Sequence, residues 1–203
     1  MKNLLEQLDN HYLCNVIIFF LGIVFSVAGT DALAGKAELS VTAPVVTASC
    51  DISIPQSVNE IPLGTFVASD FSENKGTVSV RNFQVKIENC NGEAGTMRPA
   101  LKVHGEHLAN NPYVFSSQAS NPIGFMIRAE KFSGNLADFY NTNDKTTVED
   151  NAFSYDNDAN LVKGGVMDYT VGLVAPGLAS GGDGKAPSAG DVKASVTFEF
   201  LYH

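Results

Sequence analysis

The sequence contains no tryptophan, only three cysteines and only 13 basic residues among its 203 residues. No run of lysine or arginine occurs, and 22 acidic residues give a formal net charge of −9, so the chain lacks the positive patch of a nucleic-acid-binding protein. Hydrophobic residues make up 44% of the chain, which excludes a disordered protein. The length predicts one folded domain, or two at most.

The longest hydrophobic run lies near the N-terminus, over residues 16–27. This run is shorter than the about 20 residues that a membrane-spanning helix needs. It is followed by Ala32-Leu33-Ala34, a small-x-small pattern typical of a cleavage site. We therefore predict a signal peptide over residues 1–34, although its leader carries one lysine against two acidic residues. An uncleaved membrane anchor is the alternative.

Cleavage would remove Cys14 and leave two cysteines, Cys50 and Cys90. An even pair in an exported chain favours a disulfide. The alternative is a pair of free or metal-binding thiols, which would call for a CxxC motif or nearby histidines, and neither cysteine has them.

Apolar residues alternate with period two along the rest of the chain, over residues 83–87, 123–129 and 169–175. Turn-forming residues separate these runs, so the pattern predicts an all-β sandwich. No amphipathic helix is expected after residue 34. The polar residues 141–165 predict a long loop or a strand edge with turns.

Both ends of the predicted domain are amphipathic strands. The C-terminal strand follows Gly190, and its apolar residues are Val192, Ala194, Val196, Phe198, Phe200 and Tyr202. At the other end, the apolar residues are Ala37, Leu39, Val41, Ala43 and Val45. Pro44 favours an edge or unpaired position for this strand. The strand either belongs to its own sandwich or is offered to a neighbour by strand addition.

These features resemble the structural subunits, or pilins, of chaperone–usher fimbriae of the type 1-like kind. Gly190, the fourteenth residue from the end, and the penultimate Tyr202 match the C-terminal signature of that family in identity and spacing. Segments 45–50, 61–64 and 83–90 are similar to the first two strands of the family with their joining disulfide. Ala43 stands where the family often has glycine.

The resemblance implies an immunoglobulin-like sandwich that lacks its last strand and therefore has a hydrophobic groove. Residues 35–46 would be a donor-strand extension and residues 47–203 the pilin domain, with the C-terminal strand at one edge of the groove. A periplasmic chaperone would fill the groove during export, and at an outer-membrane usher the extension of the next subunit would replace it. Repetition of this contact would give an adhesive fibre on the cell surface.

A tip adhesin of this family needs a second, receptor-binding domain, for which residues 35–203 leave no room. We therefore expect a main shaft subunit, with a minor or adaptor subunit as the alternative. A different alternative is a self-contained secreted sandwich that binds a ligand such as a glycan. That protein would fold residues 37–45 into its own sheet.

Motifs for catalysis or metal binding are weak. His104 and His107 lack the HExxH pattern of a zinc protease helix. Residues 156–160 resemble the start of a calcium loop, but Leu161 stands where glycine is required and Met167 where the bidentate glutamate should be. We expect no enzymatic activity, no cofactor, no metal and no nucleic-acid partner.

Overall fold

The computed structural model of the chain describes residues 35–42, 50–55, 60–91, 97–179, 184 and 187–203. These residues belong to one compact unit, Leu33–His203. The expected signal peptide, Ala43 and Val45 lie outside the described residues. Within the described part of the chain, no helix is long and apolar enough to cross a membrane.

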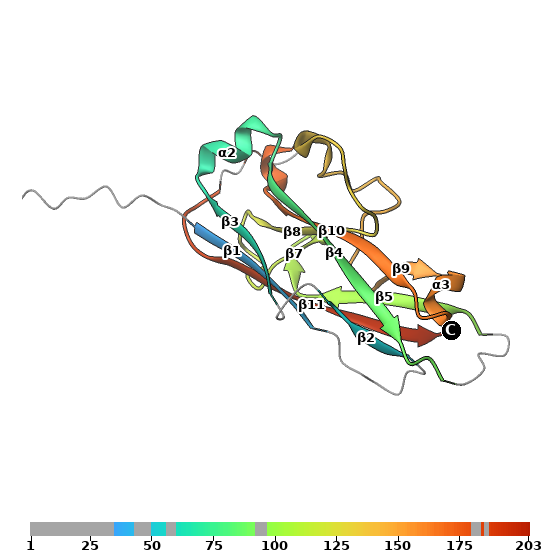
Figure 1. Cartoon of the computed structure of the whole chain (residues 1–203). Helices are drawn as coiled ribbons and strands as arrows, with labels where there is room; N and C mark the ends of the chain where they lie inside the picture. The colour runs from blue at the N-terminus through green and yellow to red at the C-terminus, as the bar shows by residue number, and fades with distance from the viewer. Residues whose placement is uncertain (1–34, 43–49, 56–59, 92–96, 180–183, 185–186) are drawn as a thin grey trace, which may run out of the picture. The chain divides into compact units, whose positions relative to one another are not determined.

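The described strands form two sheets (Figure 1), which confirms the predicted all-β sandwich. The first sheet has the order β3 (Glu60–Phe66), β1 (Gly35–Thr42), β11 (Val192–Tyr202), β5 (Pro99–Gly105) and β9 (Ala152–Asp156). The second has the order β2 (Asp51–Ser53), β4 (Thr77–Glu88), β10 (Val166–Val174), β8 (Gly124–Arg128), β7 (Asn111–Phe115) and β6 (His107–Leu108). The β1–β11 pair is parallel, whereas the other strand pairs of these sheets are antiparallel.

Short helices interrupt the strands, although the sequence predicted none. They are α2 (Ala68–Glu73), α3 (Ala159–Val162) and the 3-10 turns η1 (Leu136–Asp138) and η2 (Pro176–Leu178). None is longer than α2, which has six residues, so none spans enough turns to produce a helical hydrophobic period. The polar stretch 141–165 contains β9, an outermost strand of its sheet, as its composition predicted.

An aromatic cluster joins the two sheets. The ring of Phe198 on β11 lies edge-on to Tyr169 on β10 and to Phe83 on β4, with centroids 5.0 and 6.0 Å apart. The Tyr169 hydroxyl is 2.6 Å from Ser154 Oγ on β9, and burial raises the pKa of Tyr169 well above its usual value. Phe198 therefore contributes to the centre of the core.

Strand β8 departs from its predicted alternation, because all five of its residues are buried. Its inner face contributes Phe125 and Ile127 to the main core. On its outer face, Met126 packs in a second cluster with Leu108, Val114, Phe139 and Val174. A loop over residues 129–148 supplies Phe139 to that cluster, so β8 has no solvent-facing side.

Arg128, the last residue of β8, is buried with its charge paired. Its guanidinium forms ion pairs with Glu130, at 2.6 Å, and with Asp144. The same group lies 5.0 Å from the centroid of the Phe132 ring. Glu130 and Asp144 both belong to the loop over residues 129–148. Separation of the loop from the sheet would leave the buried charge of Arg128 unpaired, which is costly, so these contacts hold the loop in place.

We expect the Asp144 contact to give an acid-sensitive contribution to stability. The pKa of Asp144 is lowered mainly by hydrogen bonds from the backbone N–H and hydroxyl of Thr146, and further by Arg128. A lowered folded-state pKa stabilises the fold above the ordinary value of 3.8, and this contribution is lost as the pH falls through the folded-state value. Asp144→Asn should therefore lower the free energy of unfolding by about 1–3 kcal/mol at pH 7.

Urea denaturation at pH 7 and near pH 3 measures this difference. The difference in the free energy of unfolding between Asp144→Asn and the parent protein should be smaller at the lower pH. Asp138→Asn, an exposed carboxylate in the same loop, is the matched control and should change little at either pH. An equal loss of stability by Asp144→Asn at both values would contradict the assignment.

Candidate functional site

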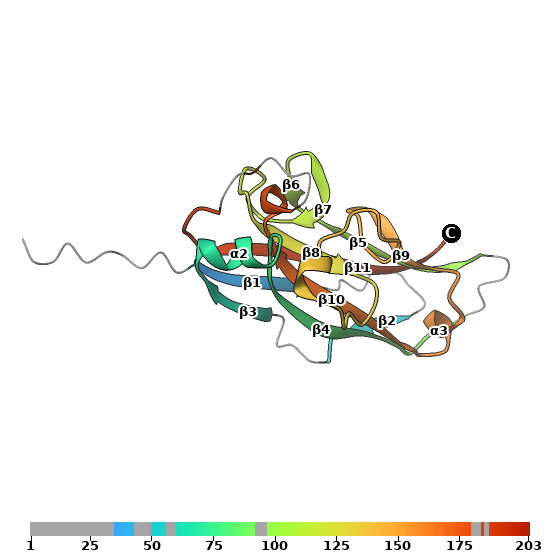
Figure 2. The ribbon, with the colours of Figure 1, turned by 90° about the horizontal axis from the view of Figure 1, so that it is seen from above.

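Strand β1 lies between β3 and β11 and is paired on both sides (Figure 2). Its pairing with β11 runs parallel from Ala37, opposite Val192, to Thr42, opposite Thr197. Its pairing with β3 is antiparallel over residues 35–40. The edge or unpaired position expected from Pro44 is therefore wrong for residues 35–42. Pro44 itself lies outside the described residues.

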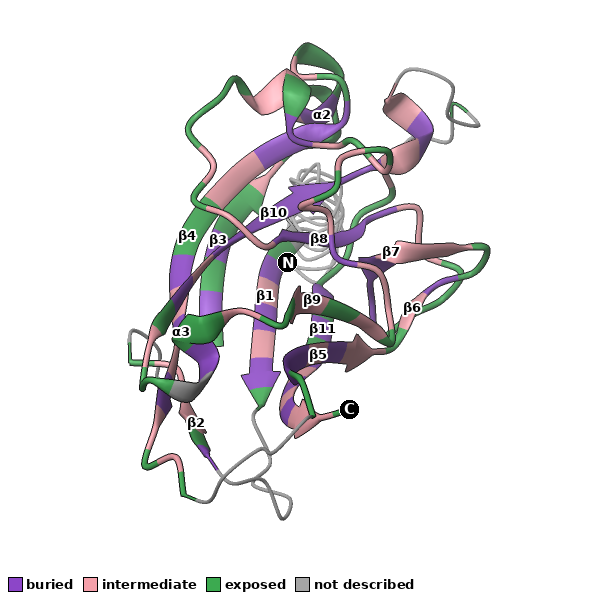
Figure 3. Ribbon diagram, turned by 90° about the vertical axis from the view of Figure 1, so that its right-hand side faces the viewer, coloured by how far each residue is buried: buried purple, intermediate pink, exposed green. Residues whose placement is uncertain are grey.

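One face of β1 is part of the core. Ala37, Leu39 and Val41 are each 2% exposed or less, whereas Lys36 and Thr42 are exposed. Figure 3 shows this alternation along the strand. The apolar side chains join the same buried cluster as residues of the opposite sheet. Burial of the two larger ones, Leu39 and Val41, contributes about 3–6 kcal/mol gross.

Strand β11 forms one wall beside β1. Gly190 precedes the strand with a φ of +144°, a conformation that favours glycine. The residues expected to face inward are buried, except that Tyr202 is half-buried; the buried ones are Val192, Ala194, Val196, Phe198 and Phe200. The C-terminal alternation thus places one continuous apolar face against the core.

Strand β3 forms the other wall, which was not predicted from the sequence as part of the site. Ile61 and Leu63 are buried. The register with β1 shifts at Leu63, because Ala37 lies opposite Gly64 and Glu38 opposite Pro62. Gly64 has a φ of +116°, which allows this bulge. The only sequence pattern that indicates this wall is the alternation of Ile61 and Leu63. Two apolar residues are too few to predict a strand among the surrounding turns.

Without β1, the first sheet would be divided between β3 and β11. The resulting gap, which we call the groove, is bounded by β3 and β11 and backed by the opposite sheet. An apolar pocket of about 540 Å³ continues it beyond the N-terminal end of β1. Its lining includes Ala37, Phe66, Phe71, Ile123, Leu173 and Val192. The groove and pocket together suit an extended, apolar peptide segment.

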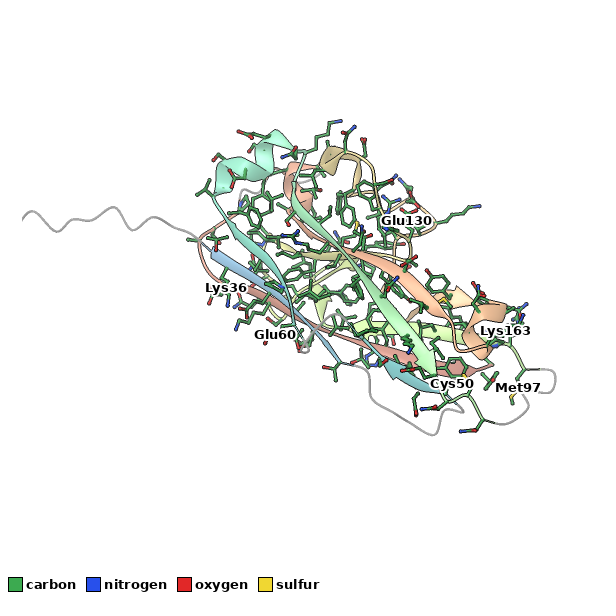
Figure 4. The ribbon with its side chains drawn as sticks, viewed as in Figure 1. Lys36, Cys50, Glu60, Met97, Glu130 and Lys163 are labelled. Carbon is green, nitrogen blue, oxygen red and sulfur yellow. A yellow bond between two sulfur atoms is a disulfide. The ribbon has the colours of Figure 1, made fainter. Side chains whose placement is uncertain are left out.

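The disulfide between Cys50 and Cys90 is present, as predicted. Cys50 directly precedes β2 and Cys90 lies two residues beyond β4, and these two strands are paired. Figure 4 places Cys50 at the end of the sandwich remote from Lys36, where β1 begins. The bridge therefore fixes the sheet opposite the groove and leaves the groove walls free of covalent links.

The histidine pair lies in an open pocket of about 620 Å³. His107 Nε2 is 3.8 Å from Asp150 Oδ2, and Asp150 Oδ1 accepts a hydrogen bond of 2.9 Å from the backbone N–H of Gly105. Among the described residues, no group of three or more His, Cys, Asp or Glu side chains could hold a metal ion. In the calcium-like segment, Leu161 and Met167 are buried in the core.

Comparison with known proteins decides the family. The family model described as "Fimbrial protein" matches residues 37–203. The chain belongs to the fimbrial protein family. The match begins at Ala37, a buried residue of β1, so it includes residues 37–42 of this strand as well as both groove walls. A curated relative of this fimbrial chain is the type-1 fimbrial protein subunit of Serratia marcescens, which is 25% identical over 101 residues.

That alignment covers 50% of this chain and 54% of the relative, so the chain spans about half the length of the curated relative it matches. Two solved structures share the fold. One is the structure of a chaperone–usher pilus that is described as revealing the molecular basis of rod uncoiling. Its TM-score is 0.53 and its identity 18%, and the match covers 80% of this chain and 92% of the other. The other is the P pilus rod subunit PapA, with a TM-score of 0.52, 18% identity, and coverage of 77% and 100%.

Proposed function

We propose that this fimbrial protein is a structural subunit that polymerises by donating residues 35–46 to the groove of a neighbouring copy or a related subunit. The product is an adhesive cell-surface fibre. A chain with both a donor strand and a groove can be joined on two sides, as a main shaft subunit must be. A minor or adaptor subunit has the same two features.

The observation that carries the proposal is the fit between β1 and the groove. β1 is paired on both sides and buries Ala37, Leu39 and Val41. The same contacts can be made by the identical strand of another chain. The donor and the groove are different surfaces, so the contact is heterologous and generates an open filament.

The proposal includes two partners that act before assembly. An empty groove would present a long apolar surface and two unpaired strand edges, which is an aggregation hazard. A periplasmic chaperone that lends a strand removes this hazard, and an outer-membrane usher provides the place where the strand is replaced. Residues 1–34 would direct the chain to the periplasm as a signal peptide.

The alternative is a self-contained secreted sandwich that binds a ligand such as a glycan. That alternative requires residues 37–45 in the chain's own sheet, and β1 occupies this position over residues 37–42. A chain without a neighbour has only its own strand to fill the groove, so this position is compatible with both functions. The family match supports the subunit.

Immunogold electron microscopy of cells that express the chain with its chaperone and usher tests the proposal. We expect label along the length of surface fibres. Antibody against a shaft subunit labels the whole fibre, whereas antibody against an adaptor subunit labels discrete points. Monomeric protein in the medium and bare cells would support the self-contained sandwich instead.

A further inference from the structure

Large hydrophobic side chains are exposed at both ends of the sandwich. Val67, directly before α2, is 48% exposed and lines the apolar pocket together with Lys36, where β1 begins. Met97 is 52% exposed, and Figure 4 places it with Cys50 at the end remote from Lys36. We call the first of these ends the α2 end and the second the disulfide end.

A second exposed apolar residue lies at the disulfide end. The carbonyl oxygen of Leu161 is 3.6 Å from Cys90 Sγ, so the turn that follows β9 lies beside the bridge. This turn leads into β10, whose first residue, Val166, is 46% exposed. Met97 and Val166 therefore both present apolar surface to solvent at this end.

The connection between the donor segment and the sandwich is short. In the proposed function residues 35–46 lie in the groove of a neighbour, and Cys50 directly precedes β2, so only residues 47–49 join the two parts. Four residue steps span at most about 14 Å even when fully extended. Two packed sheets are themselves about 10 Å apart. The disulfide end of the donating subunit must therefore lie against the sandwich that receives its strand.

The groove has two mouths, and an open filament uses the one beside Val67. At the other mouth, the receiving chain leads from Thr42 towards its own disulfide end. A donor leaving there would bring two disulfide ends together, and reciprocal donation would close a dimer. A donor leaving beside Val67 gives a contact that repeats along the filament. Alternate residues of a strand share one face in either direction, so Leu39 and Val41 still point into the core.

We propose that Val67 and the rim of the apolar pocket on one subunit form an end-to-end interface with Met97 and Val166 of the copy that donates its strand. The proposal rests on the proposed function, because strand donation is what brings the two ends together. The interface buries apolar side chains that a single chain leaves in water. It adds a contact to the donated strand, so adjacent sandwiches are held in one relative orientation.

Cross-linking of assembled fibres tests this interface. In the Val67→Cys/Met97→Cys variant, the two thiols lie at opposite ends of one molecule, beyond the reach of a short bis-maleimide. Both positions are exposed, and Cys50 and Cys90 are already bridged, so the fold should be unchanged. Treated surface fibres, denatured in hot detergent, should give a ladder of covalently joined subunits. The matched control, Val67→Cys/Ser195→Cys, has its second thiol in the middle of β11 and should give no ladder.

A second pair, Ser69→Cys/Lys163→Cys, joins the same two ends at exposed positions and should give the same ladder. Fibres that give no ladder with either pair would overturn the interface and leave strand donation intact. Cross-linked dimers in fibres of Met97→Cys alone would also overturn it, because two disulfide ends would then be in contact. Absence of fibres from the parent chain itself would instead contradict the proposed function, on which the interface depends.

Discussion

Val41→Asp should abolish surface fibres while leaving the chaperone-bound subunit in normal amounts. Val41 is 2% exposed where β1 fills the groove, so an aspartate there places an unpaired charge in the core of the receiving sandwich. This costs several kcal/mol, equivalent to a loss of about a hundredfold or more in affinity for the groove. The chaperone supplies its own strand, so its complex does not depend on Val41.

Phe198→Asp, unlike Val41→Asp, should act on the chaperone complex itself. Phe198 is fully buried and packs against Tyr169 and Phe83, so a carboxylate there disrupts the groove wall itself. The chaperone complex should be lost and the subunit degraded. Affinity capture of a tagged chaperone, together with electron microscopy of the cells, measures both outcomes.

Matched controls lie on the opposite faces of the same strands. Thr42→Asp and Ser195→Asp introduce the same charge at exposed positions of β1 and β11 and should support normal fibres. Normal fibres on cells that carry Val41→Asp would show that residues 35–46 are not the donor strand. Normal capture of Phe198→Asp by the chaperone would show that β11 does not form the groove wall.

Deletion of residues 35–44 should make the mature chain poorly soluble on its own. The deletion removes β1 and opens the groove beside Val192, Ala194 and Val196. The lost burial of Leu39 and Val41, about 3–6 kcal/mol gross, is comparable with the whole stability of many domains. The exposed apolar face and strand edges then promote aggregation. Sedimentation of periplasmic extracts, with the full mature chain as the soluble reference, measures the effect.

A chaperone, or a synthetic peptide that copies residues 36–47, should restore solubility to the deleted chain. The same peptide with Val41→Asp should fail, whereas the peptide with Thr42→Asp should succeed, because only Val41 faces the core. A soluble monomer of the deleted chain that unfolds cooperatively without any peptide would favour the self-contained sandwich.

The sequence predicted features that depend on local alternation, such as the inward residues of β11. It failed where a second layer covers a strand. Met126 and Arg128 on β8 alternate with apolar residues as if they faced solvent, yet the loop over residues 129–148 buries them. A period of two reports which face a residue occupies and does not report whether that face is covered.

The candidate site was only partly predictable for a related reason. The alternation at Ala37, Leu39 and Val41 identified a strand, but the choice between the chain's own groove and a neighbour's groove depends on partners that a single sequence does not contain. The ion pair of Glu38 with Lys193 joins residues 155 positions apart, and no local pattern indicates it.

Electron cryo-microscopy of purified surface fibres tests the central claim most directly, because it reveals which chain fills the groove between β3 and β11. We expect continuous density that leads from this groove into the sandwich of the adjacent subunit, with side chains that match residues 35–46. Density that leads back into the same subunit throughout the fibre, as β1 does in the single chain, would contradict strand donation.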